Sequence, residues 1–273
     1  MKQRLPLKAR LAADEPVMGT LAFLSCPDAI ELLAITGFDY VIIDLEHSAT
    51  NPETALHMVR AAQVRGMSPL VRVRENSEKL ILQALEIGAE GIVVPFVQSA
   101  DDVRRAASAI RFAPEGVRGT CTASRAAMYG TLRRQFLEHT RRTNGEIALV
   151  GLIEDMRGVD AIDAILACDP GLDVVLVGRS DLSASAGRMG EWNSPEVLEA
   201  TQRVIRAASR HPGPVQAGMV LGMAEDTAKW MAAGCRFIAY GTDSDLLLHA
   251  ATQARQAFTA ATKDMKREPA WST

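Results

Sequence analysis

The sequence predicts an α/β fold of the (β/α)8 TIM-barrel type, with all 273 residues in a single domain. Short apolar segments alternate with longer amphipathic segments along most of the chain, and no linker divides the chain into two parts. Eight apolar segments are present, and eight βα units favour a closed barrel over an open doubly wound sheet. A barrel of this kind takes roughly 250 residues, which fits the length of the chain.

The apolar segments are expected to form parallel strands, because buried parallel strands carry nearly continuous apolar runs. In chain order they cover residues 17–24, 39–44, 69–73, 91–95, 148–153, 174–177, 215–219 and 236–240. The segments between them have apolar residues at helical spacing. Helices are therefore expected at residues 28–36, 52–65, 78–87, 101–111, 157–166, 195–210, 223–233 and 243–265.

Local signals support several of these boundaries. Gly66, Gly88 and Gly234 each follow the last residues of a helical segment, where glycine commonly ends a helix. Within residues 157–166, apolar side chains recur at i, i+3 and i+6, which is a helical stripe between two apolar strands. Strand, helix and strand from 148 to 177 therefore predict a βαβ unit with parallel, buried strands.

Two segments depart from the regular alternation. Residues 112–146 form a connection much longer than the usual loop of about 2 to 6 residues, which predicts a lid or an interface. The helix at 243–265 is rich in alanine and could pack against a partner subunit, but the simpler expectation is that it covers its own barrel as the eighth helix. One side of that helix carries Leu246, Leu247, Ala250, Ala254, Phe258 and Ala261.

Composition favours a protein that acts on small molecules. The chain has 30 basic and 33 acidic residues, so no excess charge points to nucleic acid or to a membrane surface. Its cysteines lack metal-type spacing, which favours a reducing, cytoplasmic location. The basic N-terminus is followed by no apolar leader, and no segment approaches the roughly 20 apolar residues of a membrane span.

Polar residues gather at the predicted carboxyl ends of the strands, which in a barrel share one mouth. Each has a plainer alternative, because a carboxylate can cap a helix, a histidine can occupy a turn and an arginine can lie at the surface. Their coincidence at one face favours a functional site. The residues are Asp44, Glu46, His47, Arg72, Glu154 and Asp181.

The chemistry of this group follows from its parts. Two acidic side chains at neighbouring strand ends require a cation, a shared proton or a basic partner. A divalent ion can act as a Lewis acid on a carbonyl, a guanidinium can stabilise an enolate, and an imidazole can move a proton near neutral pH. Lys79 and Lys229 fall on helices, which disfavours a Schiff-base mechanism. The set suits carbon–carbon bond chemistry through an enolate.

Several motifs together resemble the HpcH/HpaI family of class II pyruvate aldolases: FDYVIIDLEHSATN, VRVR, GAEGIVVPFVQSADDVRRA, RFAPEGVRG, IED and VGRSDLSASAG. The resemblance extends from about residue 19 to residue 241. It implies a TIM barrel, commonly a homohexamer whose subunits exchange their C-terminal helices. It also implies a divalent metal ion (Mg, Mn or Co) and cleavage of a 4-hydroxy-2-oxoacid to pyruvate and an aldehyde. The implied partners are therefore a small-molecule 2-oxoacid, an aldehyde and further copies of the chain.

The resemblance also assigns roles to individual residues. Glu154 and Asp181 match the metal carboxylates, with Asp181 also beside the substrate, and His47 matches the catalytic base. Arg72 matches the arginine that binds and stabilises the pyruvate enolate. Ser180 matches the residue whose backbone meets the pyruvate carboxylate.

Two positions depart from the family pattern. Glu86 stands where relatives commonly have a catalytic aspartate that raises the basicity of the histidine, and it falls near the far end of a helix, so that no contact with His47 is expected within one chain. Leu152 stands where aldolases of the family have a substrate-binding glutamine, and leucine offers no hydrogen bond to an oxoacid.

Three hypotheses follow, in this order. The first is a metal-dependent aldolase. The second, motivated by Leu152, is a related lyase or synthase that uses oxaloacetate or another 2-oxoacid. The third is a catalytically silent barrel that serves in binding or assembly through the arginine-rich segment 133–142.

Overall fold

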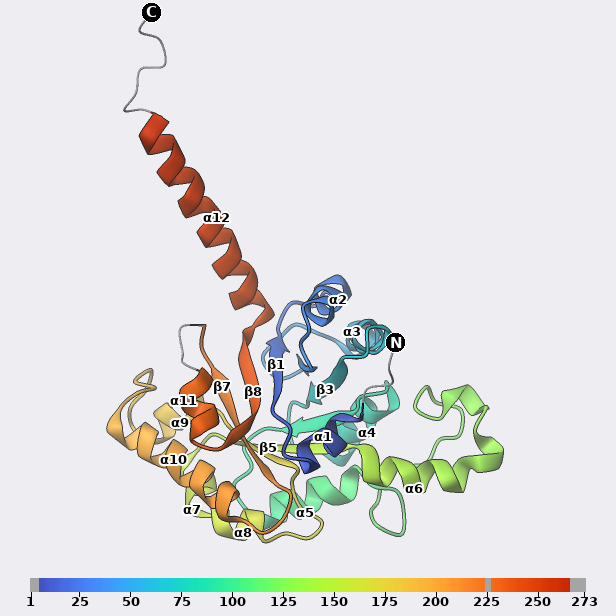
Figure 1. Ribbon diagram of the computed structural model, residues 1–273. Helices are drawn as coiled ribbons and strands as arrows, with labels where there is room; N and C mark the ends of the chain where they lie inside the picture. The colour runs from blue at the N-terminus through green and yellow to red at the C-terminus, as the bar shows by residue number, and fades with distance from the viewer. Residues whose placement is uncertain (1–4, 224–226, 266–273) are drawn as a thin grey trace, which may run out of the picture.

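The chain folds into a closed barrel of eight parallel strands that follow one another in chain order, which confirms the predicted TIM barrel (Figure 1). The computed structural model describes residues 5–223 and 227–265. The first and last strands pair in parallel and close the barrel, with Val17 opposite Phe237. All the strands therefore present their carboxyl ends at the same mouth.

Each predicted strand is present, with boundaries that shift by a few residues. The strands are β1 (Val17–Ala22), β2 (Tyr40–Asp44), β3 (Ser68–Arg72), β4 (Gly91–Val94), β5 (Ala148–Ile153), β6 (Val174–Val177), β7 (Gln216–Leu221) and β8 (Cys235–Thr242). The buried strands follow the apolar runs closely because parallel strands covered on both faces tolerate few polar residues.

The predicted helices also form, with one division. They are α2 (Pro27–Ile35), α3 (Pro52–Val64), α4 (Glu78–Glu86), α5 (Ala100–Ala109), α7 (Met156–Asp160), α8 (Ile162–Leu166), α10 (Pro195–Arg210), α11 (Thr227–Ala232) and α12 (Asp243–Met265). The expected helix 157–166 is divided at Ala161 into α7 and α8. Residues 224–226 of the expected helix 223–233 lie outside the described residues, and α11 begins at Thr227.

Three further helices are α1 (Leu7–Ala12), α6 (Phe136–Glu146) and α9 (Arg179–Ser185). The sequence analysis assigned no element before residue 17, but Leu7 and Leu11 lie one helical turn apart and join the apolar cluster inside the barrel. The helix α1 therefore closes the amino end of the barrel, and the carbonyl of Leu11 accepts a hydrogen bond from Gln216 at the start of β7.

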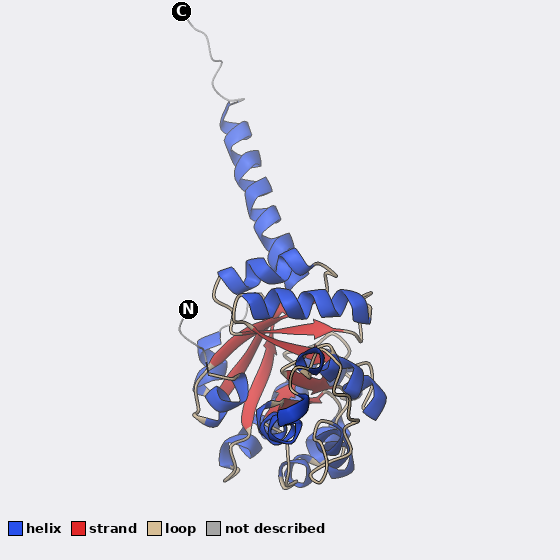
Figure 2. Cartoon of the chain, turned by 90° about the vertical axis from the view of Figure 1, so that its right-hand side faces the viewer, coloured by secondary structure: helices blue, strands red, loops and turns tan. Residues whose placement is uncertain are grey.

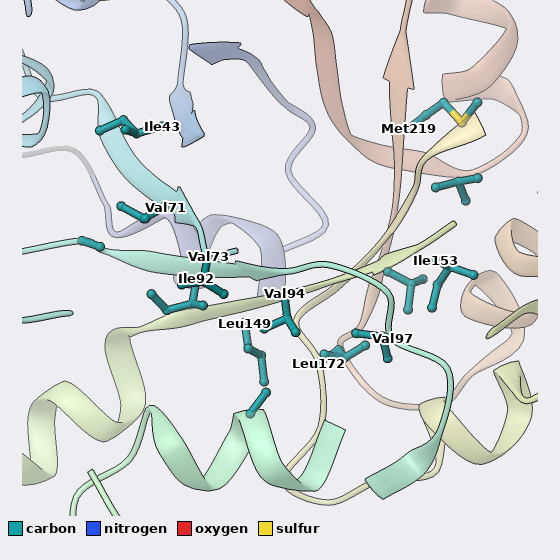
Figure 3. Close-up of a cluster of buried hydrophobic side chains, with 14 of the residues drawn as sticks. Ile43, Val71, Val73, Ile92, Val94, Val97, Leu149, Ile153, Leu172 and Met219 are labelled. Carbon is teal, nitrogen blue, oxygen red and sulfur yellow. The ribbon is translucent and has the colours of Figure 1, made fainter. Parts of the chain in front are cut away.

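Two layers of apolar side chains stabilise the barrel. One fills its interior, where Tyr40 stacks on Phe237 with ring centroids 4.1 Å apart. A Cβ atom at Gly19 would lie 2.3 Å from the Tyr40 ring, so this glycine makes room for the aromatic pair. The other layer lies between strands and helices, as Figure 3 shows for Ile92 and Leu149 among others.

The C-terminal helix corrects the simpler expectation for residues 243–265. Instead of lying on its own barrel, α12 projects away from it, and both views show this (Figures 1 and 2). The helix contacts β1 and β8 and extends away from them (Figure 1). Within 5–223 and 227–265, no helix is long and apolar enough to cross a membrane.

Candidate active site

The predicted site residues converge at the carboxyl ends of the strands. Asp44 and Arg72 are the last residues of β2 and β3 and lie directly opposite each other in the register. Glu154 follows the last residue of β5, and Asp181 lies in the first turn of α9 after β6. The parallel topology thus brings these residues to one mouth, as the sequence predicts.

Asp44 organises the turn that carries the histidine. Its carboxylate is fully buried and accepts a hydrogen bond from Arg72 Nε at 2.7 Å. The same carboxylate accepts the backbone N–H groups of Glu46 and His47, each at 3.0 Å. Asp44 is therefore neither a simple helix cap nor a free ligand, because it fixes both the arginine and the loop after β2.

Glu46 is a site residue to which the sequence analysis gave no role. Its Oε2 lies 3.4 Å from Arg72 Nη1 and 3.7 Å from His47 Nε2, and it is buried without a hydrogen-bond partner among the described residues. Burial raises the pKa of Glu46; Arg72 and His47 oppose this effect, whereas Asp44 and Asp181 add to it. Its position two residues after a strand-end aspartate was the available signal.

Glu154 is the most perturbed carboxyl group at the mouth. It is 3% exposed, and burial raises its pKa to about 8, although the backbone N–H of Phe96 donates a hydrogen bond to Oε1 at 2.8 Å. The charges of Glu46 and Asp181 raise the pKa further, and Arg72 lowers it. A Cβ atom at position 178 would lie 3.1 Å from Glu154 Oε2, so Gly178 leaves space for the carboxylate.

Phe96 also belongs to the site, and no sequence pattern indicated it. Its backbone φ is +48°, in the left-handed region that a bulky residue rarely adopts. The N–H of Phe96 donates to Glu154, and the residue is 44% exposed. Such strained residues cluster at functional sites, where the surrounding contacts maintain them.

The remaining predicted residues occupy different environments. The His47 side chain is 54% exposed at the rim, and Ser180 is exposed in the first turn of α9. Leu152 is buried in the apolar interior of the barrel, on the same face of β5 as Glu154 two residues later. It therefore forms an apolar floor beneath the carboxylate.

Glu86 is not brought to the mouth. It is the last residue of α4, close to the start of β4 at the amino end of the barrel, and its Oε1 lies 3.5 Å from Arg118 Nη2. Arg118 belongs to the long connection 112–146, and its guanidinium stacks on the Phe112 ring at 4.3 Å. Within one chain Glu86 therefore binds the connection rather than His47.

The residues at the mouth fit a divalent cation. Glu46, Glu154 and Asp181 interact electrostatically in a partly buried cluster, and Glu46 Oε2 has no hydrogen-bond partner among the described residues. A doubly charged ion would compensate the buried negative charge. In the described part of the chain no three His, Cys, Asp or Glu residues are arranged to hold a metal by themselves, so water or substrate oxygens would complete the coordination.

Comparison with known proteins identifies a matching family model and similar aldolases. The HpcH/HpaI aldolase/citrate lyase family model matches residues 20–250. A 5-keto-4-deoxy-D-glucarate aldolase of Shigella dysenteriae is 34% identical over 236 residues, covering 86% of this chain and 90% of the relative.

Two solved structures have the same fold. An HpcH/HpaI aldolase/citrate lyase family protein from Burkholderia cenocepacia has a TM-score of 0.86 and 33% identity, covering 93% of this chain and 98% of its own. The citrate synthase SbnG has a TM-score of 0.82 and 30% identity, covering 97% of this chain and all of its own.

The barrel and its relatives define an enzyme with carbon–carbon lyase activity. The chain belongs to the HpcH/HpaI aldolase/citrate lyase family. The hypothesis of a catalytically silent barrel is set aside, because the relatives are aldolases.

Proposed function

We propose that the protein is a metal-dependent aldolase that cleaves a 4-hydroxy-2-oxoacid to pyruvate and an aldehyde, or runs the reverse reaction. The observation that carries this proposal is the buried Glu154, which lies among Glu46, Asp181 and Arg72 with a pKa near 8. A buried carboxylate that is costly to ionise gains most from a bound cation. The 5-keto-4-deoxy-D-glucarate aldolases among the relatives favour a sugar-acid substrate.

Each group at the mouth has a separate role in the proposed reaction. A divalent ion (Mg, Mn or Co) held by Glu154 and Asp181 would supply Lewis-acid polarisation of the 2-oxo group. Arg72 supplies positive charge where the enolate forms, and Asp44 and Glu46 hold its guanidinium in place. The backbone of Ser180, in the first turn of α9, is suited to bind the substrate carboxylate.

His47 acts as the base in this scheme. It accepts the proton of the 4-hydroxyl group as the C3–C4 bond breaks, the aldehyde leaves, and the bonding electrons remain on the enolate. A proton added at C3 then gives pyruvate. The exposed position of His47 at the rim suits this role, because the aldehyde half of the substrate must enter and leave there.

Glu86 fits a catalytic role only across subunits. It lies at the amino end of its own barrel, whereas His47 lies at the mouth. We therefore propose that Glu86 approaches the His47 of a second copy in the assembled enzyme.

The exposed apolar surface supports a homo-oligomer, and the proposed state is a hexamer with exchanged C-terminal helices. In a closed barrel the outer face of each strand is normally covered by a helix. On the outer face of β1, however, Met18 is 40% exposed, and Leu32 and Ile35 of α2 are also exposed. Because α12 projects from its own barrel, the arm of another copy is available to cover this surface.

The proposal is tested by coupled measurement of pyruvate release from a panel of 4-hydroxy-2-oxoacids. We expect release with Mg, Mn or Co, loss of activity with chelator, and a fall in kcat of about 100-fold or more in His47→Ala, which removes a general base. The matched control is His57→Ala, because His57 is exposed on α3 and its imidazole lies near Arg60. Full activity in excess chelator would contradict the metal-dependent mechanism.

A second candidate is a lyase or synthase that uses oxaloacetate or another 2-oxoacid. It is favoured by Leu152, an apolar side chain beneath Glu154 that offers no hydrogen bond to a hydroxylated substrate. The 30% identity to citrate synthase SbnG points the same way. Efficient cleavage of hydroxy-oxoacids with oxaloacetate left unchanged would exclude this candidate.

A further inference from the structure

The C-terminal arm is tied directly to the loop that follows β1. Asp243 is the first residue of α12 and is 5% exposed. Its Oδ1 accepts the backbone N–H of Phe23 at 2.9 Å, and its Oδ2 accepts that of Leu24 at 3.1 Å. Oδ1 also accepts the N–H of Ser244 at 2.8 Å. This carboxylate thus joins two segments that lie more than 200 residues apart in the sequence.

The same loop contacts the site. The ring centroid of Phe23 lies 5.9 Å from the guanidinium carbon of Arg72, within the range of a cation–π interaction. Phe23 also packs against the apolar cluster inside the barrel. Arg72 is therefore held by Asp44 and Glu46 on one side and by the Phe23 ring on another.

A helix-capping role does not account for this arrangement. The first turn of α12 has a cap in Thr242, whose Oγ1 accepts the N–H of Asp245 at 3.0 Å, and the bond from Ser244 to Asp243 joins adjacent residues. The bonds of Asp243 to the loop after β1 are tertiary and use both carboxylate oxygens. A carboxylate with so little exposure is costly unless it is hydrogen-bonded in this way.

We propose that Asp243 is a positioning residue, which fixes Phe23 against Arg72 and so sets the orientation of the guanidinium that stabilises the enolate. The inference rests on the proposed function for the role of Arg72. Asp243 itself touches no reacting atom. It also joins the arm to the site, so the position of α12 and the orientation of Arg72 are coupled through one side chain.

The main test compares two aspartates in the same turn of α12. In Asp243→Asn the amide keeps one acceptor but presents an N–H₂ group to a backbone N–H, so part of the bond set is lost. The control is Asp245→Asn, because the Asp245 carboxylate accepts the N–H of Thr242 and, within the described residues, no hydrogen bond from Phe23 or Leu24. We expect kcat to fall about tenfold in Asp243→Asn with little change in KM, the pattern of a lost transition-state interaction, and to stay unchanged in the control.

A double-mutant cycle identifies the route. Phe23→Leu removes the ring but leaves the backbone N–H that Asp243 binds. If Asp243 acts through Phe23, each single variant loses about tenfold in kcat and the double variant loses little more, because residues in one interaction chain are not additive. Multiplicative losses, or equal kinetics in the two aspartate variants, would overturn the proposal.

Two readouts are independent of turnover. Binding of oxalate, a planar dianion that resembles the pyruvate enolate, to the Mn-loaded protein should weaken in Asp243→Asn, while Mn binding itself should not change. Hydrogen exchange of the segment 70–75 should also increase in Asp243→Asn and not in Asp245→Asn. If the wild type is inactive but exchange changes in this way, the proposed function fails and the coupling stands. Equal exchange in both variants would refute the coupling whatever the activity.

Discussion

At the scale of single residues, the site consists of charged groups whose burial costs free energy. Glu154 is almost completely enclosed and accepts only the Phe96 N–H among the described residues, while Glu46 keeps one oxygen without a hydrogen bond. Arg72 remains charged, because the bond to Asp44 and the nearby carboxylates raise its pKa against the opposing effect of burial. One guanidinium does not balance these carboxylates, so the site is pre-organised for additional positive charge.

The raised pKa of Glu154 predicts how the metal-free protein responds to pH. In the unfolded chain the group titrates near 4.5, and in the folded protein near 8. Between these values the folded state retains a proton that the unfolded state has released, so the free energy of unfolding falls as pH rises, by at most about 1.4 kcal/mol per pH unit. Below pH 4.5 both states are protonated and this effect is absent.

Glu154→Gln tests the contribution, because the amide removes the titrating carboxyl group and keeps the size of the side chain. Urea unfolding in the presence of chelator should show the wild type losing stability relative to the variant from pH 5 to pH 8. A divalent ion at pH 8 should then stabilise the wild type and not the variant. If the free energies of unfolding of the two proteins change in parallel with pH, ionisation of Glu154 does not destabilise the fold.

At the scale of elements, the apolar runs were sufficient to locate every strand. A strand that is covered on both faces consists mostly of apolar residues. The prediction of the helices was less complete. The spacing of Leu7 and Leu11 is that of a helix, but the polar residues around them obscured α1. No glycine or proline stands at Ala161 to indicate the break between α7 and α8. The direction of α12 was not predictable, because an apolar stripe fits a helix on its own barrel and on another equally well.

The candidate site was predictable to a similar extent. Strand ends placed Asp44, Arg72 and Glu154 at one mouth, because parallel topology requires it. The role of Glu46 and the strained conformation of Phe96 depend on packing between elements distant in sequence, which spacing does not encode. The pairing of Glu86 with Arg118 likewise appears only once the connection 112–146 is folded.

The helix α1 is expected to contribute strongly to stability. Leu11→Ala leaves a cavity at the closed end of the barrel, and such truncations of buried leucine cost about 2 to 5 kcal/mol. Leu5→Ala is the matched control, because Leu5 is 63% exposed and should change the free energy of unfolding by less than about 0.5 kcal/mol. Urea denaturation measures both values. Equal stabilities for the two variants would mean that α1 is not part of the cooperative fold.

At the scale of the whole molecule, two features of the single chain support the proposed assembly. Part of the outer face of β1 and α2 is bare, and α12 carries Leu247, Leu248 and Phe258 into solvent. The mouth holds His47 without Glu86, which lies at the opposite end of the barrel. Both deficits are resolved if copies of the chain assemble, so assembly and catalysis are expected to depend on each other.

A charge placed on the arm tests this dependence. Phe258 is 59% exposed in the single chain, so Phe258→Glu should leave its folding intact but oppose burial against another copy. Gln256→Glu is the control, because two residues along a helix turn the side chain to the other side of α12. Light scattering should report a smaller assembly for Phe258→Glu and the wild-type mass for Gln256→Glu. On the proposal that Glu86 reaches His47 from another copy, dissociation should lower kcat to the level of Glu86→Gln. A dissociated protein with full activity would show that one chain contains all the catalytic residues.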